Sequence, residues 1–397
     1  MAQGKCNASD QKAKRLSAHQ VYQLTVETLQ EHFDLSMDGK RYEAQDIWDV
    51  LVAAAVERMT VESATALLAD APCANTVRNA LRGLLPGDEG VSTLEAQLNE
   101  ILVAHLPKHL LAKPLPCAVD ITEIPYHGQH DEEDEGVRRG RAKHGTTHFH
   151  CYATLYTVKN NKRYTLALTL VRRSDKVLDL LKRLLERGQA LGLRLKRLYL
   201  DRGFDNNAVV AYLKQQPFPA ILPLKIQGKQ GGTRVLLHGR KSHFTTYTRH
   251  SQLYGTETLP VVVVCKYSGG RYRRQGLVRF AYLVIGNLSL PPHQVFEEYR
   301  HRFAVEASYR LMNQMRIRTT STWLALRLFL VGLALLLLNL WSFIKWTTLF
   351  IPQRGPRQVL HHLLPLARWR LWLWEMIKQR LGFVMDIIVP LPSIAVY

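Results

Sequence analysis

YRHRFAVEASYRLMNQMRIRTT, from Tyr299 to Thr320, combines five arginines with a single acid, Glu306, and enough apolar residues for partial burial. The pattern predicts one helix. Side chains three and four apart share a helix face, and this face holds Tyr299, Arg302, Glu306, Arg310 and Asn313. One interpretation is an ion pair between Glu306 and a neighbouring arginine, which contributes less than ~1 kcal/mol when exposed. The other is that Glu306 binds a more positive partner, and the rest of the chain decides between them.

The composition indicates a large, strongly basic protein. The chain has 397 residues, 47% of them hydrophobic, and a net charge of +20. That length and hydrophobic content suffice for two or three domains with their own cores. So large a basic excess predicts a polyanionic partner. A basic protein without such a ligand is the weaker interpretation, because the basic residues cluster near the motifs described below.

The cysteines and the N-terminus favour a cytoplasmic location. The five cysteines are scattered and form no Cys-x-x-Cys pair; they are Cys6, Cys73, Cys117, Cys151 and Cys265. This spacing is not that of a structural zinc site and fits reduced thiols. The N-terminal stretch MAQGKCNASDQKAKR lacks the apolar core of a signal peptide. We therefore expect a cytoplasmic, nucleoid-associated protein.

The stretch from Trp323 to Lys345 is long and apolar enough to cross a bilayer. However, Arg327 and Asn339 interrupt it, and only Leu328–Leu338 is free of polar residues. A helix that is apolar all round also occurs at the centre of a large soluble core. We favour the core helix, and keep a membrane anchor as the alternative.

The first 113 residues show helical periodicity throughout. Thr60 is a candidate N-cap of a short helix, the tight turn ADAPC follows, and a second helix begins near Asn75. A short helix, a turn and a second helix with exposed Arg78 and Arg82 form the pattern of a helix-turn-helix. The alternative is any pair of packed helices, and the basic charge of the chain favours DNA binding.

The pattern then changes to alternating strands and helices. The apolar run LPCAVD ends at Asp120, and RLYLD ends at Asp201. Between them, residues 147–158 and 162–172 have the composition of an antiparallel hairpin, and a helix follows with Ser174 as its candidate cap. NNAVVAYLKQQ predicts a helix and FPAILPL a buried strand, while LPVVVVCKYSGG and QGLVRFAYLVIG predict further strands. The predicted order is β-β-β-α-β-α-β, then a β-rich stretch, then the helix with Glu306.

Two charged or aromatic segments have simple structural interpretations. HGQHDEEDEGVRRGRAKHG, between Tyr126 and Thr147, mixes acidic and basic blocks and predicts a solvated loop rather than a metal site. The tail contains ARWRLWLWEMIKQRLGF, in which Trp369, Trp372 and Trp374 are expected to pack in a core.

Asp120 and Asp201 predict a shared cation site. Each carboxylate follows a buried strand, and on neighbouring strands the two would lie a few ångströms apart. Like charges so close are unfavourable unless a cation neutralises them, and hard oxygen ligands suit Mg²⁺ or Mn²⁺. Glu306 is the candidate third ligand. Three carboxylates can hold two ions roughly 4 Å apart for phosphodiester cleavage.

Three ordered blocks then resemble a known family. Asp120 in VDITEIPYHG, Asp201 in LDRGF and Glu306 in YRHRFAVEASYR look like the three blocks of the DDE insertion-sequence transposases. More narrowly, Tyr299, Arg302 and Glu306 match the Tyr-x2-Arg-x3-Glu-x6-Lys signature of the insertion-sequence-4 superfamily. The resemblance covers residues 114–320.

The resemblance implies a multidomain α/β protein with a ribonuclease-H-like catalytic core. We expect a helical DNA-binding domain at 1–113, the core at 114–224 and 291–350, a β-rich insertion at 225–290 and a basic, Trp-rich helical region at 351–397. Asp120, Asp201 and Glu306 would be catalytic and would bind Mg²⁺ or Mn²⁺ as two ions. The expected DNA contacts are Tyr299, Arg302, Arg310, Asn313, Arg316, Arg318, Arg78 and Arg82. The implied partners are double-stranded DNA, as terminal inverted repeats and as target, and a second copy of the chain in a synaptic homodimer.

Two departures from the family pattern are visible. The signature's Lys falls at Asn313, so Arg310 or Arg316 is expected to take over its phosphate contact. Some relatives hold a flipped base with a Trp of the insertion, but residues 225–290 contain none. Stacking there would fall to a tyrosine; the candidates are Tyr247, Tyr254, Tyr267 and Tyr272. Alternative functions are a DNA nuclease without strand transfer and a non-catalytic DNA-binding descendant.

Overall fold

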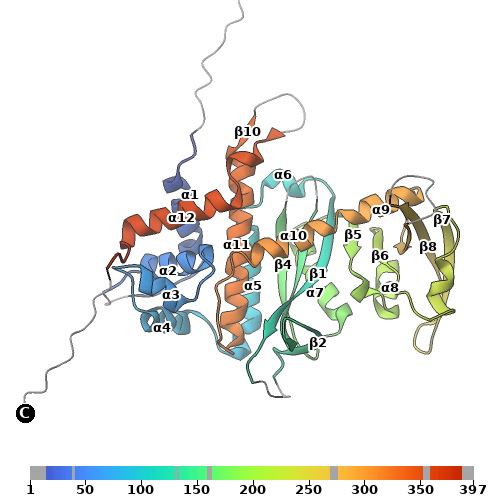
Figure 1. Cartoon of the computed structure of the whole chain (residues 1–397), viewed down its shortest axis with the longest axis horizontal. Helices are drawn as coiled ribbons and strands as arrows, with labels where there is room; N and C mark the ends of the chain where they lie inside the picture. Colours follow the sequence, from blue (N-terminus) through green and yellow to red (C-terminus); the bar gives the residue numbers. More distant parts are fainter. Residues whose placement is uncertain are drawn as a thin grey trace, which may run out of the picture. The chain divides into compact units, whose positions relative to one another are not determined.

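The computed structural model describes residues 15–37, 41–129, 131, 134–158, 163–268, 276–351 and 358–386 (Figure 1). The chain divides into two compact units, one formed by residues 1–80 with 343–397 and the other by residues 81–342. Tyr272 and the N-terminal segment with Cys6 lie outside the described residues.

The first unit joins N-terminal helices to the C-terminal helix of the chain. Its described elements are α1 (Ala18–His32), α2 (Ala44–Val56), α3 (Val61–Leu67), the start of α4 (Ala74–Leu84), the short strands β10 (Phe350–Ile351) and β11 (Gln358–Val359), and α12 (Leu366–Leu381). Helix α12 packs on α1 and α2. Asp49 accepts a 2.8 Å hydrogen bond from Tyr22 and a 2.6 Å bond from Arg380. Trp369 is fully buried, which confirms core packing for this tryptophan.

The predicted helix, turn and helix after Thr60 are present. Thr60 caps α3 by accepting a 3.2 Å hydrogen bond from the backbone N–H of Ser63. Helix α4 begins at Ala74, next to the predicted start. Arg78 forms a 3.5 Å ion pair with Glu62 of α3, with about half of each side chain exposed (46% and 54%). The exposed charge predicted for this pair of helices therefore remains accessible at Arg78.

The second unit is built on a mixed sheet, which confirms the predicted α/β class. Its strand order is β2-β3-β1-β5-β6-β9-β8-β7, and β4 also pairs with β3. The β1–β5 and β5–β6 pairs are parallel, and the other pairs are antiparallel. The strands are β1 (Leu115–Tyr126), β2 (Arg138–Lys143), β3 (Thr146–Thr157), β4 (Tyr164–Val171), β5 (Leu195–Leu200), β6 (Ala220–Pro223), β7 (His243–Ser251), β8 (Gly255–Tyr267) and β9 (Leu277–Ile285).

The structure confirms the β3–β4 hairpin and the β-rich stretch, whose strands β7–β9 extend the same sheet through the β6–β9 pair. Two predictions were wrong. The segment between Tyr126 and Thr147 is not only a loop, because β2 pairs with the free edge of β3. Ser174 does not cap the following helix α7 (Val177–Ala190), whose N-cap is Lys176. The Ser174 hydroxyl instead donates a 2.7 Å hydrogen bond to Glu135.

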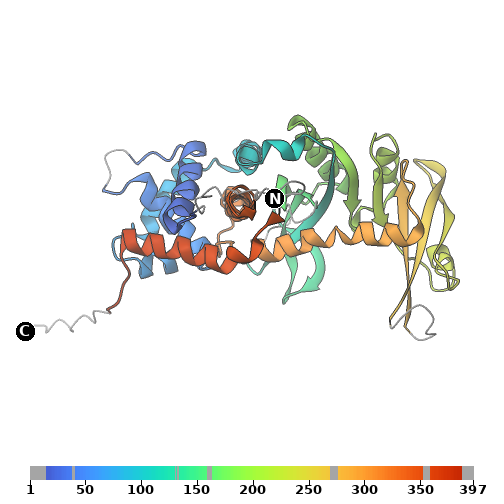
Figure 2. The ribbon, with the colours of Figure 1, turned by 90° about the horizontal axis from the view of Figure 1, so that it is seen from above.

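Helices cover both faces of this sheet. Successive side chains of a strand point to opposite faces, so neighbouring residues of β3 identify the helices on each side. Gly188 of α7 lies against Leu155, and Tyr309 of α10 (Phe303–Met312) contacts Thr154. Helix α5 (Val91–Ala104) lies on the α7 face, and α9 (Pro292–Arg300) leads into α10 on the other (Figure 2). The remaining helices of this unit are α6 (Lys108–Leu111) and α8 (Asn207–Lys214).

Helix α11 (Leu324–Thr348) is the apolar helix considered as a membrane span. In an 18-residue stretch apolar enough to span a membrane, 83% is buried inside the protein, as expected for a core helix. Asn339 explains the polar interruption, because its amide binds both the N–H and the C=O of Thr165 on the edge strand β4. Asn99 of α5 does the same for Leu168. The two asparagines satisfy backbone groups that an open edge would leave unpaired.

Candidate active site

The parallel pairing of β1 and β5 brings the two predicted aspartates together. Val119 pairs with Leu200, so the residues that come next, Asp120 and Asp201, lie next to each other on neighbouring strands. Asp201 comes directly after β5, as predicted. Asp120 does not end its strand, which was predicted wrongly, because β1 continues to Tyr126 by pairing with β3 where β5 has stopped. Asp120 is consequently buried, with only 12% of its side chain exposed, whereas Asp201 is 45% exposed.

The predicted single helix from Tyr299 to Thr320 is two helices and an extended segment. Tyr299 belongs to α9, α10 begins at Phe303, and residues 316–320 are not helical. Between the helices a backbone N–H donates to the C=O three residues earlier instead of four, as Arg302 does to Tyr299 (2.9 Å). The tight turn changes the helical register, so Tyr299 is not simply one turn below Arg302 on an unbroken face.

Two tyrosines attach the helices to the two aspartate strands. The hydroxyl of Tyr299 donates a 3.1 Å hydrogen bond to the C=O of Leu200, the residue before Asp201. The hydroxyl of Tyr309 donates a 2.7 Å bond to the C=O of Asp120 itself. Both tyrosine side chains are buried. These bonds set the position of the helices along the strands and place Glu306 beside the aspartates.

Arg302 lies among all three acids. Its guanidinium is 2.7 Å from Glu306 Oε1, 3.2 Å from Asp120 Oδ2 and 3.7 Å from Asp201 Oδ1. The arginine side chain is only 7% exposed, and its Nε has no hydrogen-bond partner among the described residues. The three carboxylates therefore converge on one buried positive charge. The ion pair of Glu306 with a neighbouring arginine, one of the two interpretations of its helix, is present with Arg302 and is part of this larger cluster.

The electrostatics of the cluster favour a cation. Burial, with the help of Asp201 and Glu306, raises the pKa of Asp120 to about 6, although Arg302 acts to lower it. A carboxyl group so disfavoured as an anion gains from any additional positive charge next to it. The site is thus under-neutralised by Arg302 alone.

The donor set fits a hard divalent cation. As they stand, no three His, Cys, Asp or Glu side chains in the described part of the chain are close enough to one another to form a metal site. Yet the acidic oxygens of Asp120, Asp201 and Glu306 surround the guanidinium, and carboxylate oxygens are the ligands that Mg²⁺ and Mn²⁺ prefer. A cation that displaced the guanidinium would meet oxygens from all three acids.

The remaining predicted site residues have different positions. Arg310, Asn313 and Arg318 are exposed on α10 and the segment after it, and Arg316 is half-buried there. Arg78 lies in the other unit of the chain, so the structure does not join it to the acidic cluster. Arg82 is exposed on the same helix, α4.

Two residues of the site were not predicted. Tyr309 follows Glu306 by three residues and shares its side of α10, a spacing that the helical period could have identified. Glu298 binds Arg197 in an ion pair and accepts a 2.7 Å hydrogen bond from Tyr199 of β5. No sequence pattern indicated this second contact between α9 and β5.

Comparisons with known proteins identify the family of this chain. Residues 112–340 match the family model described as Transposase DDE domain. The chain belongs to the DDE transposase family. The matched residues of this transposase contain both aspartate strands, the strands β7–β9 and the helix with Glu306. No curated protein sequence matches the transposase significantly.

A solved structure shares the fold of this transposase. The cryo-EM structure of the piggyBac transposase synaptic complex with hairpin DNA has 12% sequence identity and a TM-score of 0.51. The likeness covers 92% of this chain and 78% of that one. At this identity the comparison shows the fold alone, and it agrees with a ribonuclease-H-like core.

Proposed function

We propose that this transposase binds the terminal inverted repeats of its own element, cleaves them by metal-dependent hydrolysis and joins the freed 3′-hydroxyl to target DNA. The observation that carries the proposal is the convergence of Asp120, Asp201 and Glu306 on the buried Arg302. The finer assignment to the insertion-sequence-4 superfamily rests on the spacing of Tyr299, Arg302 and Glu306.

In the first step, a water oxygen attacks the scissile phosphorus and the bond from phosphorus to the 3′ oxygen breaks, leaving a 3′-hydroxyl and a 5′-phosphate. In the second, that 3′-hydroxyl attacks a target phosphorus and displaces the target's own 3′ oxygen. Asp120, Asp201 and Glu306 would hold one or two Mg²⁺ or Mn²⁺ ions. Such ions, when bound, lower the pKa of the attacking water and stabilise the leaving oxygen.

Arg302 has two roles in this proposal. Without a divalent cation, it neutralises the acids and keeps them together. With a cation held by the acids, its guanidinium would be available to the oxygens of the scissile phosphate, for which a planar fork of donors is well suited. The tyrosines at 299 and 309 act as positioning residues, because they hold the helices against the acid-bearing strands.

DNA contacts outside the centre follow from exposure and charge. Arg310, Asn313 and Arg318 continue from the acidic helix and are exposed. Phosphate oxygens are natural partners for such groups. We propose that α3 and α4, with Arg78 and Arg82, bind the terminal repeats. The similar solved structure is a synaptic complex with hairpin DNA, which supports DNA as the partner. The proposal also includes a homodimer that pairs two ends and a cytoplasmic, nucleoid-associated location.

The experiment compares wild type, Asp120→Asn and Asp179→Asn on duplexes of the inverted repeats that flank the gene. Asp179 is an exposed acid on α7, on the opposite face of the sheet. We expect Asp120→Asn to lose Mg²⁺-dependent cleavage while it still shifts the duplex in a gel, and Asp179→Asn to behave as wild type. Full cleavage by Asp120→Asn would refute the assignment. Pre-cleaved ends then test strand transfer, and cleavage without joining would favour a nuclease.

A further inference from the structure

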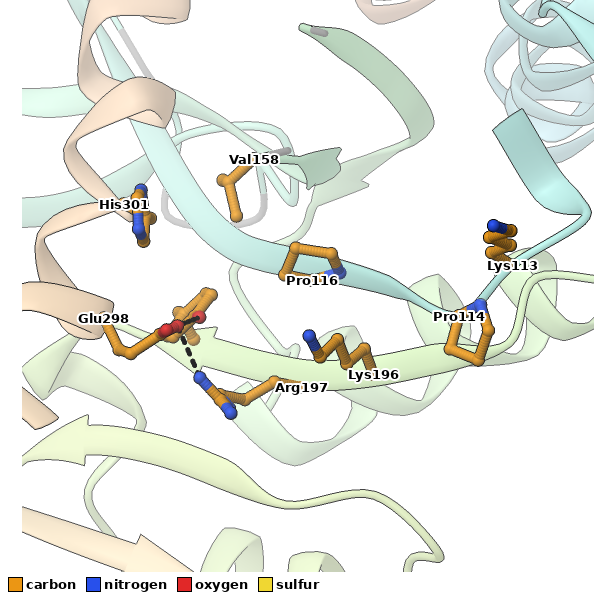
Figure 3. Close-up of a pocket in the computed structure, with 9 residues that line it drawn as sticks. Lys113, Pro114, Pro116, Val158, Lys196, Arg197, Glu298 and His301 are labelled. Carbon is orange, nitrogen blue, oxygen red and sulfur yellow. Dashed lines mark hydrogen bonds and ion pairs between the residues drawn. The ribbon is translucent and has the colours of Figure 1, made fainter. Parts of the chain in front are cut away.

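A cavity of about 490 Å³ lies beside the beginnings of β1 and β5 and the end of α9 (Figure 3). Pro116 of β1 and Lys196 and Arg197 of β5 form one side, with Lys113 just before β1. Glu298 and His301 face them from the helix. The volume is within the range of ligand sites in proteins, roughly 300–1,000 Å³.

The balance of charge in this cavity is positive. Its one acid, Glu298, already forms an ion pair with Arg197 and accepts a hydrogen bond from Tyr199. Lys113 and Lys196 are exposed, and neither has an ion-pair partner among the residues that the structure describes. Two lysines therefore remain to bind an anion.

Arg197 is a further basic residue at the wall of the cavity. It is only 8% exposed, yet its Nε lacks a hydrogen-bond partner in the described part of the protein. Its guanidinium adds positive charge at this wall of the cavity, and guanidinium groups attract phosphate oxygens.

The cavity lies in line with the catalytic acids. Alternation along β5 puts Arg197, Tyr199 and Asp201 on one face of the sheet. Glu298 precedes Arg302 by four residues on the helices that cover this face. Four residues of strand span about 13 Å, a distance that corresponds to a few nucleotides of a DNA strand.

We propose that this cavity binds a backbone phosphate of the DNA strand that enters the active site, a few nucleotides from the scissile phosphate. Lys113 and Lys196 contact its oxygens, and the guanidinium of Arg197 adds positive charge at the cavity wall. The inference rests on the proposed function, because the position of the cavity relative to Asp201 selects DNA over a free anion.

The test is a double-mutant cycle between protein and DNA. Single phosphates of the repeat duplex are replaced, one at a time, by neutral methylphosphonates, and binding is measured with wild type and with Lys113→Ala/Lys196→Ala. Removing the contacts to this one phosphate should lower the slope of log K against log salt by about 1. We expect one methylphosphonate position to weaken binding by wild type and to have no further effect on the lysine variant. Lys176→Ala/Lys214→Ala, which removes exposed lysines at the N-cap of α7 and at the end of α8, should keep the wild-type slope and the wild-type response at that position.

Unchanged binding and salt slope in Lys113→Ala/Lys196→Ala would overturn the proposal, as would additive losses at every methylphosphonate position. A third experiment measures the binding of inorganic phosphate to wild type and to the lysine variant by calorimetry. Phosphate binding that depends on the two lysines, without any effect on DNA binding, would assign the cavity to a free anion and overturn the DNA assignment. Cleavage is scored separately at saturating DNA. Failure of wild type to cleave would refute the proposed function, whereas the binding cycle reports on the cavity alone.

Discussion

Arg302→Met removes the charge at the centre of the acidic cluster and keeps much of the side-chain volume. Removing one partner of a buried ion pair costs about 3–5 kcal/mol, because the other charge stays buried without compensation. The pair with Asp120 is of this kind, since the two side chains are 7% and 12% exposed. Asp201 and Glu306 are 45% and 49% exposed, so their pairs add less than ~1 kcal/mol each. Because the pKa of Asp120 is already about 6, uptake of a proton limits the loss, and we expect a decrease of about 3 kcal/mol in unfolding free energy at pH 7.5.

Urea unfolding in EDTA and in Mg²⁺ measures this effect. Adding Mg²⁺ should stabilise Arg302→Met more than wild type, because the ion no longer competes with the guanidinium. The second change Asp120→Asn should recover most of the loss, since it removes the uncompensated carboxylate. Arg300→Met is the matched control, because Arg300 is 58% exposed in its pair with Glu297 and should change stability by less than ~0.5 kcal/mol. If Arg302→Met is as stable as wild type in EDTA, or Asp120→Asn fails to rescue it, the reasoning is wrong.

Three further predictions follow from buried contacts. Tyr309→Phe loses the hydrogen bond to the C=O of Asp120, so the unfolding free energy should fall by about 1 kcal/mol and single-turnover cleavage should slow, while DNA affinity stays unchanged; unaltered cleavage would contradict a positioning role. Burial lowers the pKa of His150 to about 4, so the stability that the neutral imidazole contributes is present above about pH 6.5 and is lost as the pH falls towards 4. The difference in unfolding free energy between wild type and His150→Gln should therefore shrink by about 3 kcal/mol across that window, and a difference that does not change with pH would contradict the prediction. Asn339→Leu leaves the N–H and C=O of Thr165 unpaired and should cost about 2–4 kcal/mol in urea unfolding, whereas a neutral result would show that water replaces the amide.

Local patterns were sufficient for several strands and for the position of Asp201. The β3–β4 hairpin was predictable because its residues are β-formers bounded by a polar turn. Asp201 was placed correctly because a strand that ends at a buried sheet edge exposes the next residue. Glu306 was identifiable from the spacing of its block, and the fold then placed it beside Asp120 and Asp201.

Features set by distant contacts could not be predicted in this way. The length of β1 beyond Asp120 depends on its pairing with β3, which no local signal encodes. The break before Phe303 depends on how Tyr299 and Tyr309 bind two different strands. The sequence predicted that Arg302 contacts phosphate. Its contact with all three acids depends on how β1, β5 and α10 are brought together, and no local pattern encodes that.

The central claim is that three carboxylates, now held by Arg302, form one divalent-cation site. Crystals grown with Mn²⁺ and measured at the manganese absorption edge test it directly. The account predicts an anomalous peak in contact with Asp120, Asp201 and Glu306, with the guanidinium of Arg302 turned away from them. Two results at saturating Mn²⁺ would contradict the claim. One is the absence of a peak between the acids, with Arg302 still paired with them, and the other is a peak bound by other residues.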